Sequence, residues 1–267
     1  MYVIGERING MFTVIGDALA AKDPKPVQQM AEKQLANGAD CLDINVGTRV
    51  PKAERAAAMK WLVEAVREVT DKPLSIDNPG IDTVRVGLAA ACKKGRGIIN
   101  STTGQVDKLA AFMKLAAEFH AGIVGLSIDE NGVAATADAK VEIGMRTIAA
   151  AAEVNVSPED VYLDPIILPV NCDQKTPGIV LQTIAQFKML SDPAPHVVIG
   201  LSNLSQGASE RPLINRTFLA LAIGAGLDAS IHDPLDTELT NTMITAELLM
   251  NKCIYSDSYL KAYLQKS

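Results

Sequence analysis

The sequence predicts a single (β/α)8 barrel, and three observations support this fold class. Eight short apolar runs recur along the chain, with helix-forming stretches between them. The length of 267 residues is close to the ~250 of one barrel of this kind, which leaves little chain for a second domain. Nearly every apolar run ends on a polar residue, as expected where the C-terminal ends of barrel strands carry an active site. We therefore expect one barrel domain over residues 1–267.

The polar residues at the ends of the predicted strands form a regular series. In chain order they are Gly5-Glu6-Arg7-Ile8-Asn9, Asp43-Ile44-Asn45, Ser75-Ile76-Asp77, Asn100-Ser101, Ser127, Asp164, Ser202-Asn203 and His232-Asp233. Such carboxylates and carboxamides, gathered in one ring, are suited to holding a flat heterocycle rich in hydrogen-bonding groups.

Helix signals fall between these strands. Asp23 and Pro24 indicate an N-cap with proline at the first helical position, and Thr176 with Pro177 indicates a second start of this kind. The stretch Gly224-Ala-Gly226-Leu-Asp228 is typical of a helix C-cap, because it precedes a strand and so does not match a dinucleotide loop. Helices are predicted wherever apolar residues recur on one helical face or the composition favours helix. The predicted ranges are 53–69, 106–119, 139–152, 176–190, 211–225 and 236–252.

Composition excludes several classes of function. The formal net charge of −6 argues against nucleic acid as the main partner, since phosphate binding favours a basic surface. No apolar run approaches the ~20 residues of a membrane span. The chain opens directly on a predicted strand, so we expect no signal or transit peptide and a cytoplasmic location. The cysteines and histidines are too scattered to predict a metal site.

Three strand-end residues are candidates for ligand recognition. Asp77, Asn100 and Asp164 end the third, fourth and sixth predicted strands, and neighbouring strands lie ~4.8 Å apart. A carboxylate can accept two parallel hydrogen bonds from the 2-amino group and N3–H of a pterin or guanine-like ring, and we assign this role to Asp164. Asp77 and Asn100 then serve the remaining ring nitrogens. One such aspartate is equally consistent with a helix N-cap, but several in one ring favour a ligand site.

Asn203 has a different predicted role, because a carboxamide is neither a strong acid nor a strong base. It can donate a hydrogen bond that stabilises developing charge or a protonated nitrogen, although asparagine is also a common turn residue. The sequence contains no P-loop, nucleophile elbow or plausible triad. We therefore expect a protein that binds and orients its ligand and leaves the difficult chemistry to a cofactor.

Six ordered motifs, which extend over essentially the whole chain, together resemble the pterin-binding methyltransferases. They are Gly5-Glu6-Arg7-Ile8-Asn9, Asp43-Ile44-Asn45-Val46-Gly47, Asp77, Ile99-Asn100-Ser101-Thr102, Asp164-Pro165 and Gly200-Leu201-Ser202-Asn203-Leu204-Ser205. That family includes the methyltetrahydrofolate:corrinoid/iron–sulfur protein methyltransferase of acetogens and the folate module of cobalamin-dependent methionine synthase. It is related more distantly to dihydropteroate synthase.

The resemblance implies a role for each matching residue. Asp77, Asn100 and Asp164 match the pterin-anchoring positions, and Asn203 matches the asparagine that hydrogen-bonds near N5, where the methyl group sits. The further positions that the resemblance places around the barrel mouth are Glu6, Asp43, Asn45, Ser202 and Gln206. The sequence departs from the acetogen enzyme after Asp77 and at 231–234, which bears on the corrinoid-protein docking surface more than on the pterin pocket.

The activity that the resemblance implies is methyl transfer between N5 of tetrahydrofolate and the cobalt of a separate corrinoid protein. Co(I) attacks the methyl group of methyltetrahydrofolate, and Asn203 favours the N5-protonated state that makes N5 a better leaving group. The chain lacks the Asp-x-His-x-x-Gly loop that ligates cobalamin, so the partner protein supplies the corrinoid and no bound metal is expected. The resemblance also implies a homodimer. The direction of transfer stays open between acetogenesis and the demethylation of methoxylated aromatics or glycine betaine.

Three alternatives compete with this interpretation. A dihydropteroate synthase-like enzyme must bind pyrophosphate, but Asn203 and His232 stand where that family's cationic residues are expected. A non-catalytic folate-binding subunit of a methyl-transfer complex has no need of a donor at N5, which Asn203 provides. An unrelated phosphate-metabolising barrel calls for a glycine-rich phosphate grip after the seventh and eighth strands, and this grip is missing.

Overall fold

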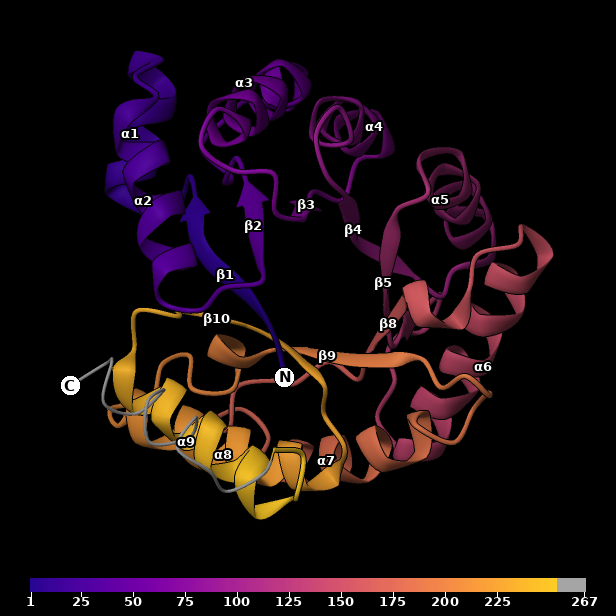
Figure 1. The fold of residues 1–267 in the computed structure, drawn as a ribbon. Helices are drawn as coiled ribbons and strands as arrows, with labels where there is room; N and C mark the ends of the chain where they lie inside the picture. The colour runs from indigo at the N-terminus through magenta and orange to yellow at the C-terminus, as the bar shows by residue number, and fades with distance from the viewer. Residues whose placement is uncertain (254–267) are drawn as a thin grey trace.

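Eight parallel strands close into a barrel in the computed structural model, which describes residues 1–253. The order of neighbouring strands around the barrel is β1-β10-β9-β8-β5-β4-β3-β2, and the helices lie outside the ring of strands (Figure 1). The predicted (β/α)8 fold is confirmed. Residues 254–267 of the predicted domain lie outside the described residues, so its boundaries stay a prediction.

The elements alternate as a barrel of this class requires. The barrel strands are β1 (Tyr2–Asn9), β2 (Cys41–Asn45), β3 (Leu74–Asp77), β4 (Gly97–Thr103), β5 (Gly122–Leu126), β8 (Val161–Asp164), β9 (His196–Gly200) and β10 (Ala229–His232). A short antiparallel hairpin follows β5 and consists of β6 (Ile128–Asp129) and β7 (Gly132–Val133). The α-helices are α1 (Thr13–Ala21), α2 (Lys25–Ala36), α3 (Arg55–Arg67), α4 (Ile81–Ala91), α5 (Val106–Phe119), α6 (Ala137–Glu153), α7 (Thr176–Phe187), α8 (Arg211–Ala225) and α9 (Thr237–Leu249). Short 3-10 turns are η1 (Lys52–Glu54), η2 (Pro158–Asp160) and η3 (Leu201–Asn203).

The predicted helices agree with this arrangement, but both predicted N-caps, Asp23 and Thr176, were wrong by one residue. Helices α5 and α8 match the predicted bounds, and Gly226, with φ of 112°, forms the predicted C-cap. Pro24, not Asp23, occupies the N-cap of α2, and the Asp23 carboxylate accepts a hydrogen bond from the Lys25 amide at 3.1 Å. Thr176 is the first residue of α7, and its hydroxyl donates to Asp173 at 2.9 Å.

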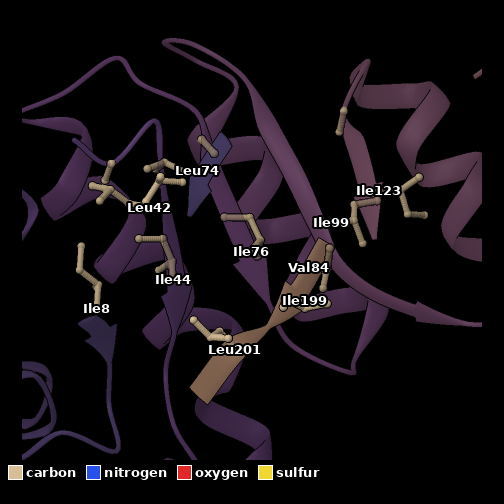
Figure 2. Packing of buried hydrophobic residues seen from close by; sticks show 14 of the residues in the cluster. Ile8, Leu42, Ile44, Leu74, Ile76, Val84, Ile99, Ile123, Ile199 and Leu201 are labelled. Atoms are coloured by element: carbon tan, nitrogen blue, oxygen red, sulfur yellow. The ribbon is translucent and has the colours of Figure 1, made fainter. Parts of the chain in front are cut away.

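The hydrophobic core has two layers because strand side chains alternate between the two faces of the barrel wall. The outer layer packs strand residues such as Leu42, Ile44 and Ile76 against the helices, and Figure 2 shows this packing at close range. A smaller cluster comes from the intervening strand positions, including Ile4, Cys41 and Ile98, and fills the barrel interior.

The same alternation directs the predicted site residues toward the barrel axis. Glu6, Asp43 and Asn100 each stand two positions beyond an inner-cluster residue, so their side chains face the same interior. The strand register places Asn45 opposite Asp77, and Asp77 opposite Asn100. The polar side chains therefore form a layer above the apolar interior, at the C-terminal end of the barrel. Within residues 1–253 no helix is both long and apolar enough to span a bilayer.

Candidate active site

A cavity of about 470 Å³ lies at the C-terminal ends of the strands. Seven of the nine predicted site residues line this cavity, namely Glu6, Asp43, Asp77, Asn100, Asp164, Ser202 and Asn203. They come from β1, β2, β3, β4, β8 and η3. Residues far apart in the sequence therefore converge on one space of the size that a small ligand needs.

The other two predicted residues do not line the cavity. Asn45 stands beside it, where its Nδ2 donates to Asp77 Oδ2 at 2.6 Å and its Oδ1 accepts from the Gly47 amide at 2.7 Å. Asn45 therefore holds the Asp77 carboxyl in place. Gln206 is exposed in the turn after η3 and contributes nothing to the cavity wall.

Asp43 organises the floor of the site. Its Oδ1 accepts hydrogen bonds from Ser75 Oγ at 2.6 Å and from Asn100 Nδ2 at 3.0 Å. Because the Asn100 amide donates to Asp43, its carbonyl oxygen stays available to accept a hydrogen bond from a ligand. Burial raises the pKa of Asp43 to about 6, against the opposing effect of these two hydrogen bonds.

The surroundings of Asp77 and Asp164 raise the pKa values of the two carboxyl groups to different extents. Burial, together with the charge of Asp43, raises the pKa of Asp77 to about 8, although the bond from Asn45 opposes this shift. Burial raises the pKa of Asp164 only to about 6, because its Oδ1 accepts from the Ile166 amide at 2.7 Å and the Lys140 ammonium lies nearby. Lys140 is itself buried and donates to the Pro165 carbonyl at 2.6 Å. From this difference we assign the neutral form to Asp77 and the ionised form to Asp164 near pH 7.

We expect Asp77→Asn to stabilise the ligand-free protein at neutral and mildly alkaline pH. The pKa of Asp77 rises from 3.8 to about 8 on folding, so the unfolded chain releases this proton between about pH 4 and pH 8 while the folded chain retains it. Wild-type stability therefore declines as pH rises through that window, and the neutral amide removes this contribution. Urea unfolding at pH 8 is expected to show a gain of about 1–3 kcal/mol, which shrinks toward pH 5.

The matched control for this prediction is Asp17→Asn, since Asp17 is exposed in α1. It should change the free energy of unfolding by less than about 0.5 kcal/mol at either pH. A loss of stability in Asp77→Asn at pH 8 would contradict the assignment of a protonated Asp77.

Glu6, Ser202 and Asn203 form a second polar group of the cavity wall. Ser202 Oγ donates to Glu6 Oε1 at 2.8 Å, which joins η3 to β1. Burial raises the pKa of Glu6 to about 7, with smaller contributions from the carboxylates of Asp233 and Asp43, whereas Ser202 and Arg7 lower it. Gly200 makes room for Asn203, because a Cβ atom at position 200 would lie 2.9 Å from Asn203 Nδ2.

Several wall residues of the cavity are not among the predicted site residues. They are Arg7, Asn9, Phe12, Leu126, Gly200, Arg211 and Ile231. Strict alternation along β1 predicts that Arg7 faces away from the interior that Glu6 faces. The pairing of β1 with β2, however, shifts register between Gly5 and Ile8, and such an irregularity redirects side chains. Arg211 begins α8 and is adjacent to the cavity only in the folded chain.

A parallel barrel with several converging carboxyl and carboxamide groups at its mouth is typical of enzymes that bind a flat, hydrogen-bonding ring. The chain belongs to the family of pterin binding enzymes, whose model matches residues 10–232. This membership confirms the family resemblance predicted from the motifs.

Named relatives of the chain are methyltransferases. It is 28% identical over 269 residues to the methylcorrinoid:tetrahydrofolate methyltransferase of Eubacterium limosum, with 99% of this chain and 97% of the relative covered. It is 31% identical over 243 residues to the methionine synthase of Mycobacterium leprae, with 86% of this chain and 20% of that much longer protein covered.

Solved structures with this fold include two dihydropteroate synthases. The enzyme from Coxiella burnetii, in complex with pteroic acid, has a TM-score of 0.72 at 15% identity, with 94% of each chain covered. The enzyme from Yersinia pestis has a TM-score of 0.66 at 16% identity, also with 94% of each chain covered. At this level of identity the likeness concerns the fold.

Proposed function

We propose that this protein transfers a methyl group from a separate methylcorrinoid protein to N5 of tetrahydrofolate. The observation that carries the proposal is the convergence of Asp77, Asn100 and Asp164 in one cavity, with the exposed Asn203 on its wall. The name of the Eubacterium limosum relative, which aligns over nearly its whole length, supports folate as the acceptor. We therefore assign the direction of methyl transfer, from the corrinoid protein to the folate, which the sequence motifs left open.

The pterin ring binds through complementary donors and acceptors. The ionised Asp164 accepts from the 2-amino group and N3–H, and this charge-assisted pair fixes the orientation of the ring. The free carbonyl oxygen of Asn100 accepts from a ring N–H. Asp77, which carries a proton near neutral pH, donates to a ring acceptor.

Methylation of N5 requires that its lone pair be free and that its proton be removed. The docked corrinoid supplies the methyl group and keeps the electron pair of the bond that breaks. Because N5–H is itself a donor, the carbonyl oxygen of Asn203 accepts from it, in place of the donor role expected from the sequence. This bond points the N5 lone pair toward the methyl group and stabilises the positive charge that develops on nitrogen. Glu6, held by Ser202 at 2.8 Å, accepts the N5 proton as the new N–C bond forms, so that charge and atoms balance.

The role of Glu6 predicts a pH dependence with a definite sign. Its carboxylate must be ionised to accept a proton, and its pKa is about 7. We expect the single-turnover rate of folate methylation to rise with pH through this value and then level off. In Glu6→Gln the inflection should disappear and the rate at pH 8 should fall by about 10²–10⁴-fold. If the rate of Glu6→Gln depends on pH as that of wild type does, another group accepts the N5 proton.

The experiment that tests the proposal is an anaerobic assay with tetrahydrofolate and free methylcobalamin in place of the partner protein. Enzyme-dependent formation of 5-methyltetrahydrofolate, with matching growth of the Co(I) absorbance, is the expected result. Tetrahydrofolate binding without turnover, both here and with candidate corrinoid proteins, would instead identify a non-catalytic folate-binding subunit. Pteroate formation from p-aminobenzoate and a dihydropterin pyrophosphate would identify a dihydropteroate synthase-like enzyme.

A further inference from the structure

We propose that Arg7, Phe12 and Arg211 form a subsite for the p-aminobenzoyl-glutamate tail of the folate, and that this subsite makes the protein selective for folates over simple pterins. The inference rests on the proposed function and extends it to a part of the substrate that the pterin anchors do not touch. All three residues line the same cavity as those anchors.

The charge distribution of the cavity favours one orientation of the ligand. Its wall carries four carboxyl groups, Glu6, Asp43, Asp77 and Asp164, and the two cations Arg7 and Arg211. The pterin ring of a folate presents N–H donors, whereas the glutamyl tail presents carboxylates. The tail therefore has complementary partners only at the two arginines, since carboxylates beside the pterin anchors would repel it.

Arg211 lies on the side of the site from which the tail must leave. Its Nη2 donates to the Ser202 carbonyl at 3.1 Å, and its Nε donates to Ser205 Oγ at 3.2 Å. These bonds hold the guanidinium beside Asn203, which we assign to N5. In folates the tail is attached at C6, the ring atom next to N5, so Arg211 stands close to the point of attachment. Its Nη1 donors are not used by these two bonds.

Arg7 has unused hydrogen-bonding capacity. Its Cζ lies 4.2 Å from the centroid of the Phe12 ring, and its Nη1 lies 3.4 Å from Asp233 Oδ2. Among the described residues its buried Nε has no hydrogen-bond partner. A planar guanidinium held on an aromatic ring, with donors left over, is well suited to receive a carboxylate.

Phe12 supplies the apolar part of the subsite. It precedes α1 as the N-cap residue and lines the cavity beside Arg7. The aminobenzoyl group connects the pterin to the glutamate, and an aromatic side chain is a favourable contact for this ring. The cavity wall thus offers a partner for each part of a folate: carboxyl anchors for the pterin, Asn203 for N5, Phe12 for the aminobenzoyl ring and two arginines for the glutamate.

Binding measurements with two probes test this inference. Anaerobic calorimetry would compare tetrahydrofolate with 6-methyltetrahydropterin, which has the same ring and no tail. We expect wild type to bind tetrahydrofolate at least about tenfold more tightly. Arg7→Gln and Arg211→Gln should each weaken tetrahydrofolate binding by about tenfold and leave the affinity for 6-methyltetrahydropterin within about twofold. Arg216→Gln is the matched control, since Arg216 lies in α8 but does not line the cavity.

The outcomes separate the subsite from the proposed function. Equal losses for both ligands, with unchanged thermal unfolding, would assign the arginines to the pterin pocket and overturn the subsite. No loss for either ligand would place the tail elsewhere and also overturn it. If wild type binds 6-methyltetrahydropterin and tetrahydrofolate equally, pterin recognition stands and the subsite fails. If wild type binds neither ligand, the proposed function fails and the subsite fails with it.

Discussion

Asn203→Ala is expected to lower the rate of methyl transfer by about 10²–10³-fold while the dissociation constant of tetrahydrofolate changes by less than about threefold. In the proposed mechanism the carboxamide interacts with N5, where charge develops during the reaction, whereas the proposed pterin anchors on β3, β4 and β8 hold the ring in the ground state. An interaction that strengthens only in the transition state affects kcat and leaves ground-state binding nearly unchanged. Single-turnover kinetics and calorimetry on the same preparations measure the two quantities.

Two further variants sharpen this test. Gly200→Ala should partly reproduce the loss, because the added Cβ would lie 2.9 Å from Asn203 Nδ2 and displace the carboxamide. Ser209→Ala, an exposed change in the loop before α8, should retain the wild-type rate. If Asn203→Ala loses affinity and rate in proportion, Asn203 is a binding residue and the mechanism assigned to it is wrong.

Asp164→Asn is expected to weaken tetrahydrofolate binding by about 100-fold, which corresponds to ~3 kcal/mol. The ionised carboxylate offers an acceptor to each of the two N–H donors of the pterin edge. The asparagine amide would place its own NH2 donor against one of these N–H groups, so that a buried donor would have no acceptor. The fold should tolerate the change, since the amide oxygen can still accept from the Ile166 amide, as Asp164 Oδ1 now does at 2.7 Å.

The comparison with Asp77 gives this prediction its specificity. Asp77→Asn also removes a carboxyl group from the cavity, but Asp77 carries a proton near pH 7, with a pKa of about 8. An asparagine imitates that neutral, hydrogen-donating group, so we expect a loss of affinity of less than about tenfold. Equal losses at positions 77 and 164 would show that both carboxylates bind the pterin in the same ionised form.

The barrel and most of the candidate site could be predicted from the sequence because both follow from local periodicity. Strand side chains alternate, so an inward apolar residue such as Ile98 predicts that the side chain two positions later, here Asn100, also faces the interior. Eight such runs require one closed sheet, and parallel strands bring their C-terminal residues to one end. The strand ends thus indicated Asp77, Asn100, Asp164 and Asn203. The family resemblance added three further residues that also line the cavity, Glu6, Asp43 and Ser202.

The exceptions arise where position depends on contacts between distant segments. Asn45 was predicted to line the mouth, but its hydrogen bond to Asp77 across the β2–β3 pair holds it beside the cavity. Gln206 was predicted with it, but the turn after η3 leaves this side chain exposed. The direction of a turn depends on what packs beneath it, and periodicity carries no information about that.

What the sequence by itself determined is therefore the number and kind of elements, the face of each strand and the chemical types gathered at the mouth. Only the tertiary structure decided which of these groups face the cavity, which carry protons, and which cations join them. Beside the register shift of β1, Arg7 lines the same cavity as Glu6, and the fold carries Arg211 to the Ser202 carbonyl. Burial separates the pKa values of Asp77 and Asp164, about 8 and about 6. Each of these depends on contacts between strands and loops, which exist only once the barrel has closed.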